Sequence, residues 1–478
     1  MIAAWATILA AAAAEDHALQ AAMADPQTAQ ATILREIIGN NAQTAFGREH
    51  GFAGIQTVAD FRSAVPIRSY DDMRHWINQM EAGAVNVLTA EPVLAWEETG
   101  GSSGGAKLIP YTGSSLAAFR AAILPSVSDL VRRRPGVATG KIYAAISPAG
   151  RLPRVMGDGV PLGVPDAAYL GADVIPAFAS LLAVPPDVAL ISDVPKWQAE
   201  TLRHLKSCPD LSFVSVWSPT FWLELCRDIS PRESRRLWPR LDTISCWTHG
   251  VSASFVPTLQ EAFPHVFIEP KGLLSTESPI TVAHGAAAGC RPALRSCFIE
   301  WVDQAGHIRL SHDLVVGQSY RAVITTPGGL YRYDTRDKVV CVSTDGSGPR
   351  LVFEGREGLA SDMVGEKLED AFVASVLAGL PVPARLVAST TSAPHYELWL
   401  DVPAATATSS WLEQVEQALK ANPQYAYARN MGQLKPLVGR CRPGFWRVFD
   451  GDNPRLAVIK SSPLQGLHPN TIATKLTG

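Results

Sequence analysis

Short apolar runs alternate with helical stretches up to about residue 345 of this chain, and this alternation limits the folds that are available to it. Each run has the length and the β-branched and aromatic content of a buried strand. The runs are KIYAAIS, VALIS, LSFVSVWS, HVFIEP and YRAVITT, and helical stretches cover 196–206 and 220–229. The pattern predicts an α/β domain rather than a β-sandwich or a helix bundle.

The pattern of the sequence changes near residue 345, where a cluster of turn-forming residues, STDGSGPR, precedes the strand-like run LVFEGR. A helical pattern at about 366–378, two strand-like runs and a further helical pattern follow. A chain of 478 residues with 47% apolar content can bury more than one core. We therefore expect a large α/β domain over residues 1–354 and a smaller α+β domain over residues 355–478.

Three helix starts carry local signals. The first 23 residues lack the basic n-region of a signal peptide and continue their helical pattern through Glu15, so we expect a structural helix there. Thr112 or Ser114 is expected to cap the helix TGSSLAAFRAAIL. Ser410 and Glu413 have the spacing of a capping box for a helix that ends by Pro423.

Charge and cysteine content exclude several classes of partner. The net charge is only −3 with acids and bases mixed, so we expect no nucleic-acid partner. Seven cysteines lie far apart without a CxxC pair, which predicts reduced thiols and no zinc site. No apolar run approaches the roughly 20 residues that span a bilayer. We expect a cytoplasmic monomer with small-molecule partners and no membrane contact.

The segment TGGSSGGAK, residues 99–107, contains four glycines and two serines before one lysine. Without Cβ atoms in the way, backbone amides can approach an anion, the serine hydroxyls add hydrogen bonds, and Lys107 adds a positive charge. The segment is built like a polyphosphate cradle.

Three other interpretations of this segment compete. A Walker A loop requires Gly before the lysine and Ser or Thr after it, whereas Lys107 lies between Ala106 and Leu108. Gly100, Ser102 and Gly104 satisfy GxSxG, the nucleophile elbow of a serine hydrolase, but Pro110 and a second turn precede the next helix. A surface linker is the third interpretation.

TGGSSGGAK followed by LIPYT resembles the phosphate-binding signature of adenylate-forming enzymes, and the Leu-Ile-Pro after the lysine is similar to the GH3 acyl-acid amido synthetases. The resemblance spans most of the chain. It continues in NNAQTAFGREHGF, FRSAVPIRSYDDM, INQMEAGAVNVLTAEPV, KGLLSTES, GGLYRYDTRD and FEGREGLASDMVGEKLED. It implies the adenylate-forming architecture, with the smaller C-terminal domain as a mobile lid.

The resemblance also implies roles for individual residues around ATP. Glu277 would be catalytic as the ligand of Mg²⁺, although a solvated glutamate is an alternative. Asp337 would grip both ribose hydroxyls, with Arg356 beside it. The phosphate-binding residues would be Thr99, Gly101, Ser102, Ser103, Gly104, Lys107 and Thr276.

Other implied roles concern the acid and the proton transfers. Arg120 would bind the acid's carboxylate, or else extend from an apolar face to water. Lys460 would stabilise the acyl-phosphate transition state of adenylation, with Lys435 as the competing lysine. His249 is a candidate general base, and an ordinary core histidine is its alternative.

Two positions depart from the family pattern. Leu273 and Leu274 stand where many relatives have an aromatic residue and glycine, and Arg336 stands where relatives commonly have glycine before the ribose-binding aspartate. The implied reaction activates a carboxylic acid with ATP as an acyl adenylate. It then transfers the acyl group to an amine, expected to be an amino acid, or in a rival interpretation to coenzyme A.

Overall fold

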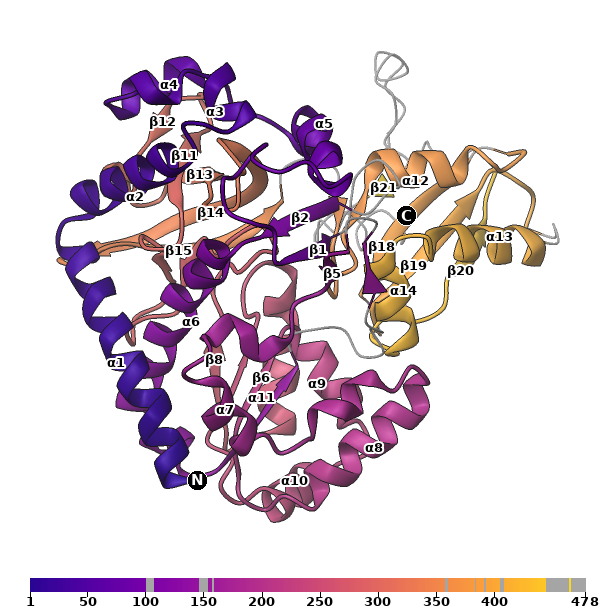
Figure 1. Ribbon diagram of the computed structural model, residues 1–478. Coiled ribbons are helices and arrows are strands. Elements are labelled where there is room, and N and C mark those ends of the chain that lie inside the picture. The colour runs from indigo at the N-terminus through magenta and orange to yellow at the C-terminus, as the bar shows by residue number, and fades with distance from the viewer. Residues whose placement is uncertain are drawn as a thin grey trace. The chain divides into compact units, whose positions relative to one another are not determined.

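The structure is a computed structural model that describes residues 1–99, 107–145, 154–156, 159–356, 360–382, 384–390, 393–404, 408–443 and 464–465 (Figure 1). The chain divides into two compact units. Unit 1 comprises Met1–Thr99 and Leu108–Arg356, and unit 2 comprises Glu357–Gly478 together with Gly100–Lys107. In the described part of the chain, no helix has both the length and the apolar character needed to cross a bilayer.

Unit 1 contains eleven described α-helices, and the expected first helix is the longest of them. They are α1 (Ile2–Ala24), α2 (Pro26–Asn40), α3 (Ala45–Glu49), α4 (Val58–Ala64), α5 (Tyr70–Glu81), α6 (Gly113–Arg133), α7 (Ile175–Leu181), α8 (Val194–Lys206), α9 (Pro219–Leu225), α10 (Pro231–Leu237) and α11 (Val256–Ala262). Helix α1 runs beside α6 (Figure 1), where Trp5 and Ile8 pack with Leu124 and Leu130.

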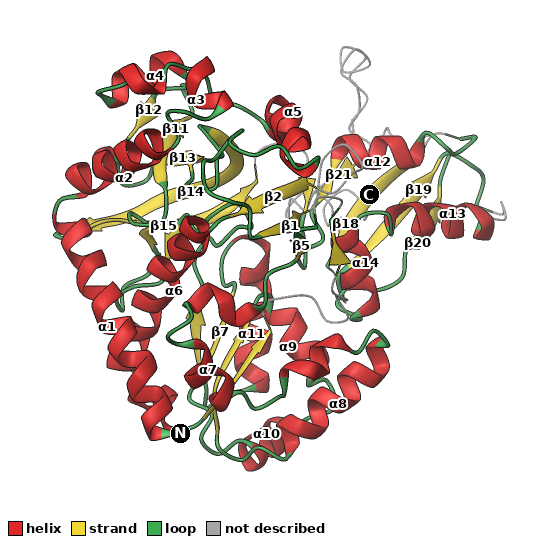
Figure 2. Cartoon of the chain, viewed as in Figure 1, coloured by secondary structure: helices red, strands yellow, loops and turns green. Residues whose placement is uncertain are grey.

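A four-stranded parallel sheet forms one half of unit 1. Its strands follow the order β3-β6-β7-β8, and each neighbouring pair is parallel. Helices flank the sheet (Figure 2), as the α/β pattern predicts. The strands are β3 (Lys141–Ala145), β6 (Leu211–Val216), β7 (Thr243–Cys246) and β8 (Phe267–Pro270).

A five-stranded antiparallel sheet has the order β12-β11-β13-β14-β15. It consists of β11 (Phe298–Asp303), β12 (Ile308–Arg309), β13 (Ser319–Thr325), β14 (Tyr333–Asp345) and β15 (Gly348–Arg356). The register of β13 against β14 skips from Arg321 opposite Lys338 to Val323 opposite Asp334. Because residues 335–337 then face a single residue of β13, β14 contains a bulge.

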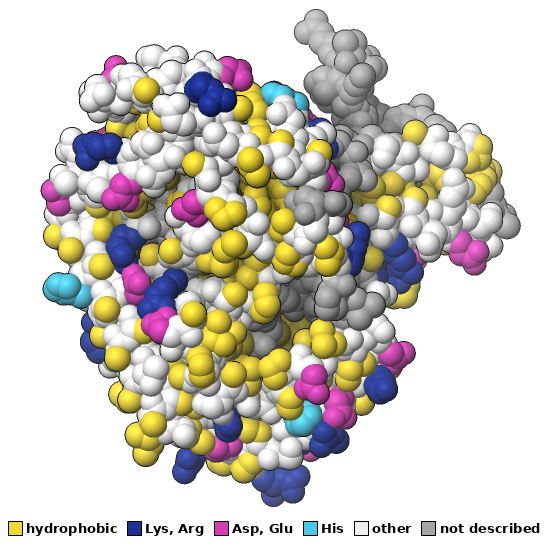
Figure 3. Space-filling view, viewed as in Figure 1, with side chains coloured by type: hydrophobic (Ala, Val, Ile, Leu, Met, Phe, Trp, Pro, Cys, Tyr) yellow, Lys and Arg dark blue, Asp and Glu magenta, His cyan; other side chains and the backbone are white. Residues whose placement is uncertain are grey.

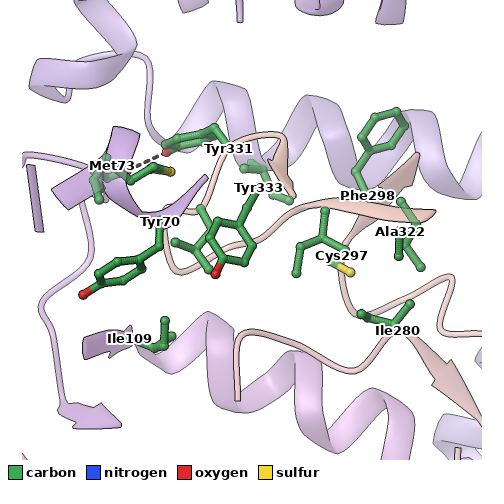
Figure 4. Close-up of a cluster of buried hydrophobic side chains, with 14 of the residues drawn as sticks. Tyr70, Met73, Ile109, Ile280, Cys297, Phe298, Ala322, Tyr331 and Tyr333 are labelled. Atoms are coloured by element: carbon green, nitrogen blue, oxygen red, sulfur yellow. Dashed lines mark hydrogen bonds between the residues drawn. The ribbon is translucent and has the colours of Figure 1, made fainter. Parts of the chain in front are cut away.

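A third sheet, of order β2-β1-β5-β4, carries the two ends of the glycine-rich segment. Its strands are β1 (Ala95–Thr99), β2 (Lys107–Tyr111), β4 (Arg154–Val155) and β5 (Pro161–Leu162), and β9 (Thr281–Val282) pairs separately with β10 (Arg291–Pro292). The largest core cluster joins this sheet to the antiparallel one. Ile109, Tyr331 and Tyr333 are among the buried side chains drawn in Figure 4.

Unit 2 has its own core around a sheet of order β20-β19-β18-β21. Its elements are β16 (Ala360–Ser361), β17 (Leu368–Glu369), α12 (Asp370–Leu377), β18 (Ala384–Ser389), β19 (His395–Leu400), α13 (Ser409–Leu419), α14 (Pro423–Asn430), β20 (Val438–Cys441) and β21 (Leu464–Gln465). Glu366 is fully buried there and accepts hydrogen bonds from the amides of Met363 and Val364 and from the hydroxyl of Tyr396. A mobile-lid role for residues 355–478 remains a prediction.

Most predicted elements are confirmed, and the exceptions have local causes. Thr112 caps α6 through a bond from the amide of Ser115, at 3.2 Å, as expected. VALIS was expected to be a strand, but residues Pro186–Leu190 form a 3₁₀ helix because prolines favour the first turn of a helix. The prediction of a capping box at Ser410 is wrong: the N-cap of α13 is Thr408, and its side chain makes no capping hydrogen bond.

Candidate active site

The glycine-rich segment connects two strands. Strand β1 ends at Thr99, which is 5% exposed, and β2 begins at Lys107, which is 7% exposed. The predicted phosphate-binding residues between them lie outside the described residues: Gly101, Ser102, Ser103 and Gly104. Since a strand rather than a helix follows Lys107, the strand-turn-helix geometry of a nucleophile elbow at Ser102 does not fit.

The turn that contains Thr276 and Glu277 is held by two tyrosine hydroxyls from distant elements. Tyr111, the last residue of β2, donates to the backbone carbonyl of Thr276 at 2.7 Å. Tyr333, the first residue of β14, donates to Oε1 of Glu277 at 3.3 Å. The turn closes on itself through the hydroxyl of Ser275, which donates to the carbonyl of Ser278 at 2.9 Å.

Burial keeps both tyrosines in the form that donates a hydrogen bond. It raises the pKa of Tyr111 and the pKa of Tyr333 well above their ordinary value, and the negative charge of Glu277 acts in the same direction on each. The side chain of Glu277 is only partly exposed, and one of its oxygens accepts from Tyr333. The tyrosine hydroxyl therefore helps to orient the carboxylate of Glu277.

Asp337 and Arg356 are brought together across a strand pair. They lie directly opposite each other in the register of β14 and β15, although they are 19 positions apart in the chain. The bulge in β14 ends at Asp337, whose amide donates to the Thr335 hydroxyl at 3.1 Å. Bulges of this kind re-aim side chains beside functional sites.

Arg336 provides the bend of this bulge. Its φ is +61°, which lies in the left-handed region that favours glycine, and its amide donates to Oδ1 of Asp334 at 2.9 Å. The position where the family resemblance predicts glycine therefore has a glycine-like backbone here, with an exposed arginine side chain.

The described residues contain no group of three histidine, cysteine, aspartate or glutamate side chains that could hold a metal ion. Magnesium bound to a nucleotide needs only one or two protein carboxylates, because phosphates and water supply its other ligands. Glu277, partly exposed and oriented by Tyr333, fits such a single-carboxylate role.

Comparison with known proteins identifies the family. The GH3 family N-terminal domain matches residues 16–230, and the GH3 family central domain matches residues 293–356, so the two together span more than half of the chain. This chain belongs to the GH3 family. The central-domain match includes β14, Asp337 and the last residue of unit 1, Arg356.

Similar proteins include two from Oryza sativa subsp. japonica. One is the putative indole-3-acetic acid-amido synthetase GH3.10, which is 24% identical over 72% of this chain and 80% of the relative. The other is the probable indole-3-acetic acid-amido synthetase GH3.1, 23% identical over 86% of this chain and 82% of the relative.

Solved structures share the fold of this GH3 protein. AtGH3.15 acyl acid amido synthetase in complex with 2,4-DB superposes with a TM-score of 0.65 at 18% identity, covering 98% of this chain and 96% of that one. 2-Hydroxyisobutyryl-CoA ligase superposes with a TM-score of 0.57 at 15% identity, covering 97% and 92%. The predicted adenylate-forming architecture is therefore confirmed.

Arg120 of this GH3 protein is engaged by other protein groups. Its guanidinium bonds to Asp173 at 2.5 and 3.0 Å, to Glu15 at 3.2 Å and to the carbonyl of Leu170 at 2.6 Å. These contacts join α6 to α1 and to the segment before α7. Binding of the acid's carboxylate by Arg120 remains a prediction. It would require the guanidinium to give up one of these hydrogen-bond partners for the substrate.

Of the residues predicted to stabilise the transition state or to accept a proton, Lys435 and His249 lie in the described part of the chain. Lys460 lies outside the described residues. Lys435 belongs to unit 2, where its ammonium donates to the carbonyl of Gly432 at 2.9 Å. Burial lowers the pKa of His249, which lies three residues after β7, so the imidazole is neutral at neutral pH and able to accept a proton.

Sequence reasoning left some participating residues without a role. Tyr111 and Tyr333 lie inside quoted motifs, LIPYT and GLYRYDTRD, and their positions at strand ends next to motif residues were the available signal. Lys271, at the start of KGLLSTES, was likewise unassigned, although it is a basic residue directly after a strand-like run.

Proposed function

We propose that this GH3 protein activates a carboxylic acid with ATP as an acyl adenylate and then transfers the acyl group to an amine, namely an amino acid. One observation carries the proposal. Two hydrogen bonds hold the Thr276–Glu277 turn against distant strands. Tyr111, at the end of β2, donates to Thr276, and Tyr333, at the start of β14, donates to Glu277. Membership of a family whose relatives are named amido synthetases supports it.

In the first half-reaction, a carboxylate oxygen of the acid attacks the α-phosphorus of ATP and pyrophosphate leaves. The protein contributes alignment and charge compensation. Asp337, opposite Arg356, is placed to accept hydrogen bonds from the ribose hydroxyls. Thr276, Lys107 and Thr99, with the loop residues Gly101, Ser102, Ser103 and Gly104, are the proposed phosphate contacts.

We propose that Mg²⁺ accompanies ATP and that Glu277 is its protein ligand. When bound, the ion offsets the charge of the leaving pyrophosphate. Tyr333 fixes the orientation of the carboxylate before the ion arrives, so that less conformational freedom is lost on binding.

In the second half-reaction, the amine nitrogen attacks the acyl carbon, a C–N bond forms, and AMP leaves with the oxygen that joined the acid to phosphorus. The amine must lose a proton, and the neutral imidazole of His249 is the candidate acceptor. Lys460 is the candidate for stabilising the adenylation transition state.

The cellular setting is also part of the proposal. All seven cysteines are free thiols, which suits a reducing cytoplasm. Acidic and basic side chains are interspersed on the face drawn in Figure 3, which suits small-molecule partners rather than nucleic acid or a membrane surface. We propose that the protein acts as a monomer in secondary metabolism.

The test is acid-dependent exchange of labelled pyrophosphate into ATP over a panel of carboxylic acids, followed by mass analysis of products formed with amino acids and with coenzyme A. Acid-dependent exchange with an amide product supports the proposal. Exchange followed by a thioester only would assign an acyl-CoA ligase. Ester cleavage without ATP would instead assign the serine hydrolase.

A further inference from the structure

Four side chains that have no role so far gather at one edge of the parallel sheet. Ser215 is the penultimate residue of β6, Trp217 follows β6, Trp247 follows β7, and Lys271 follows β8. The carboxyl ends of parallel strands meet at the same edge, which is where α/β folds bind their ligands.

Contacts link these side chains across the three strands. The ammonium of Lys271 donates to Oγ of Ser215 at 2.6 Å and lies 5.3 Å from the ring centroid of Trp217. The rings of Trp217 and Trp247 follow with centroids 5.5 Å apart. The cation and the aromatic pair therefore form one continuous surface, in which a cation–π contact contributes to holding the ammonium.

This cluster, Ser215, Trp217, Trp247 and Lys271, stays within reach of solvent. All four residues are partly exposed. In contrast, Trp222 of α9 and Trp238, the residue after α10, are both 0% exposed and fill the core. The four tryptophans at 217, 222, 238 and 247 thus divide into two core residues and two that a ligand can touch.

Lys271 has hydrogen-bonding capacity that the described protein does not use. An ammonium has three donors, and Ser215 takes one. No carboxylate in the described part of the chain pairs with Lys271, and its neighbouring titratable group is the Cys246 thiol. Burial lowers the pKa of Lys271 to about 8, so a cation is kept in a poorly solvated place without a counter-charge.

The cluster is connected to the proposed adenylation site by a short stretch of chain. Residues 271–277 run from the end of β8 to the Thr276–Glu277 turn, and six residues span at most ~20 Å. An acid whose carboxylate reacts near the phosphates can therefore extend its other end toward the sheet edge.

We propose that the acyl substrate is an aromatic acid whose ring carries a second oxygen, as hydroxyl or carboxylate, and that Lys271 binds this oxygen while Trp217 and Trp247 contact the ring. The inference rests on the proposed function and names its substrate class. Ser215 positions the ammonium and does not itself select the acid.

The test compares pyrophosphate exchange for matched acids at saturating ATP and magnesium. Benzoate and phenylacetate are each compared with their 2-, 3- and 4-hydroxy and carboxy derivatives, for the wild type, Lys271→Met and Ser215→Ala. Lys141→Met is the control, because Lys141 begins β3 at the opposite edge of the same sheet and donates to the carbonyl of Ser180. Thermal unfolding curves check that every variant is folded.

We expect the wild type and Lys141→Met to prefer at least one oxygen-bearing acid over its parent by about tenfold or more, and Lys271→Met to lose most of that preference. Ser215→Ala should reduce the preference less. The inference is overturned, with the proposed function intact, if the wild type activates the parent acids as well as their oxygen-bearing derivatives, or if Lys271→Met keeps the preference. Absence of exchange with every acid would overturn both.

Discussion

Asp337 of β14 and Arg356 of β15 face each other as direct cross-strand partners at the end of unit 1. Side chains paired in this way have Cβ atoms roughly 5 Å apart. A carboxylate and a guanidinium at this separation can act together on one ribose, since the carboxylate accepts from hydroxyls and the guanidinium donates.

Asp337→Asn tests this pairing. An amide offers one oxygen instead of two charged ones, so we expect the KM for ATP to rise by about 10- to 100-fold with a smaller change in kcat. The control is Asp345→Asn in the same strand, because Asp345 pairs with Arg291 and should affect stability only. An equal effect of both variants on the KM for ATP would contradict the ribose role.

Tyr333→Phe tests how Glu277 is oriented. Removing the hydroxyl leaves the ring in the core but removes one hydrogen bond that orients the carboxylate, so we expect kcat for pyrophosphate exchange to fall by about five- to tenfold. Tyr331→Phe is the control: its hydroxyl donates to the carbonyl of Leu88 in the same core (Figure 4). If the control loses as much activity, the tyrosine acts through core packing.

Glu277→Gln tests the magnesium role. A neutral amide binds the hard cation poorly, so the magnesium concentration that gives half-maximal exchange should rise by about tenfold or more. Glu261→Gln, on exposed α11, is the control and should titrate like the wild type. An unchanged magnesium requirement in Glu277→Gln would remove this residue from the site.

Glu366 makes the stability of the protein depend on pH. Burial and the nearby Asp362 raise the pKa of Glu366 to about 7, whereas an unfolded glutamate titrates near ~4.3. Between these two pKa values the folded state binds more protons than the unfolded state. The free energy of unfolding therefore falls as pH rises, by roughly 4 kcal/mol in total, and is level above pH ~7.

Glu366→Gln should remove this loss. We expect the Tm of the variant relative to the wild type to rise steadily between pH ~5 and pH ~7 as the wild type weakens. The exposed Glu413→Gln in α13 should follow the wild type at every pH. A constant difference in Tm between Glu366→Gln and the wild type would show that Glu366 keeps an ordinary pKa.

Local features of the fold could be predicted from the sequence because their causes are local. The cap at Thr112 depends only on the backbone amide three residues later, and strand β6 is one of the short apolar runs, LSFVSVWS, that the pattern predicts. The order of the motifs along the chain likewise indicated which segments to assign to the proposed adenylation site.

Contacts between distant segments could not be predicted in the same way. Tyr111 and Thr276 are 165 positions apart, and Arg120 meets Glu15 across 105 positions. Neither pairing follows from spacing or periodicity, because it depends on how sheets and helices pack. The functional group of Lys271 was visible in the sequence, but its neighbours Ser215 and Trp217 became known only from the fold.

The central claim, that an acid is joined to the α-phosphorus of ATP, is tested most directly by isotope transfer. The enzyme is given an acid labelled with ¹⁸O in both carboxylate oxygens, ATP, magnesium and an amino acid, and the AMP is analysed by mass spectrometry. The account predicts AMP that carries one heavy oxygen, with the other retained in the amide. AMP or ADP without label, formed together with product, would contradict an acyl adenylate.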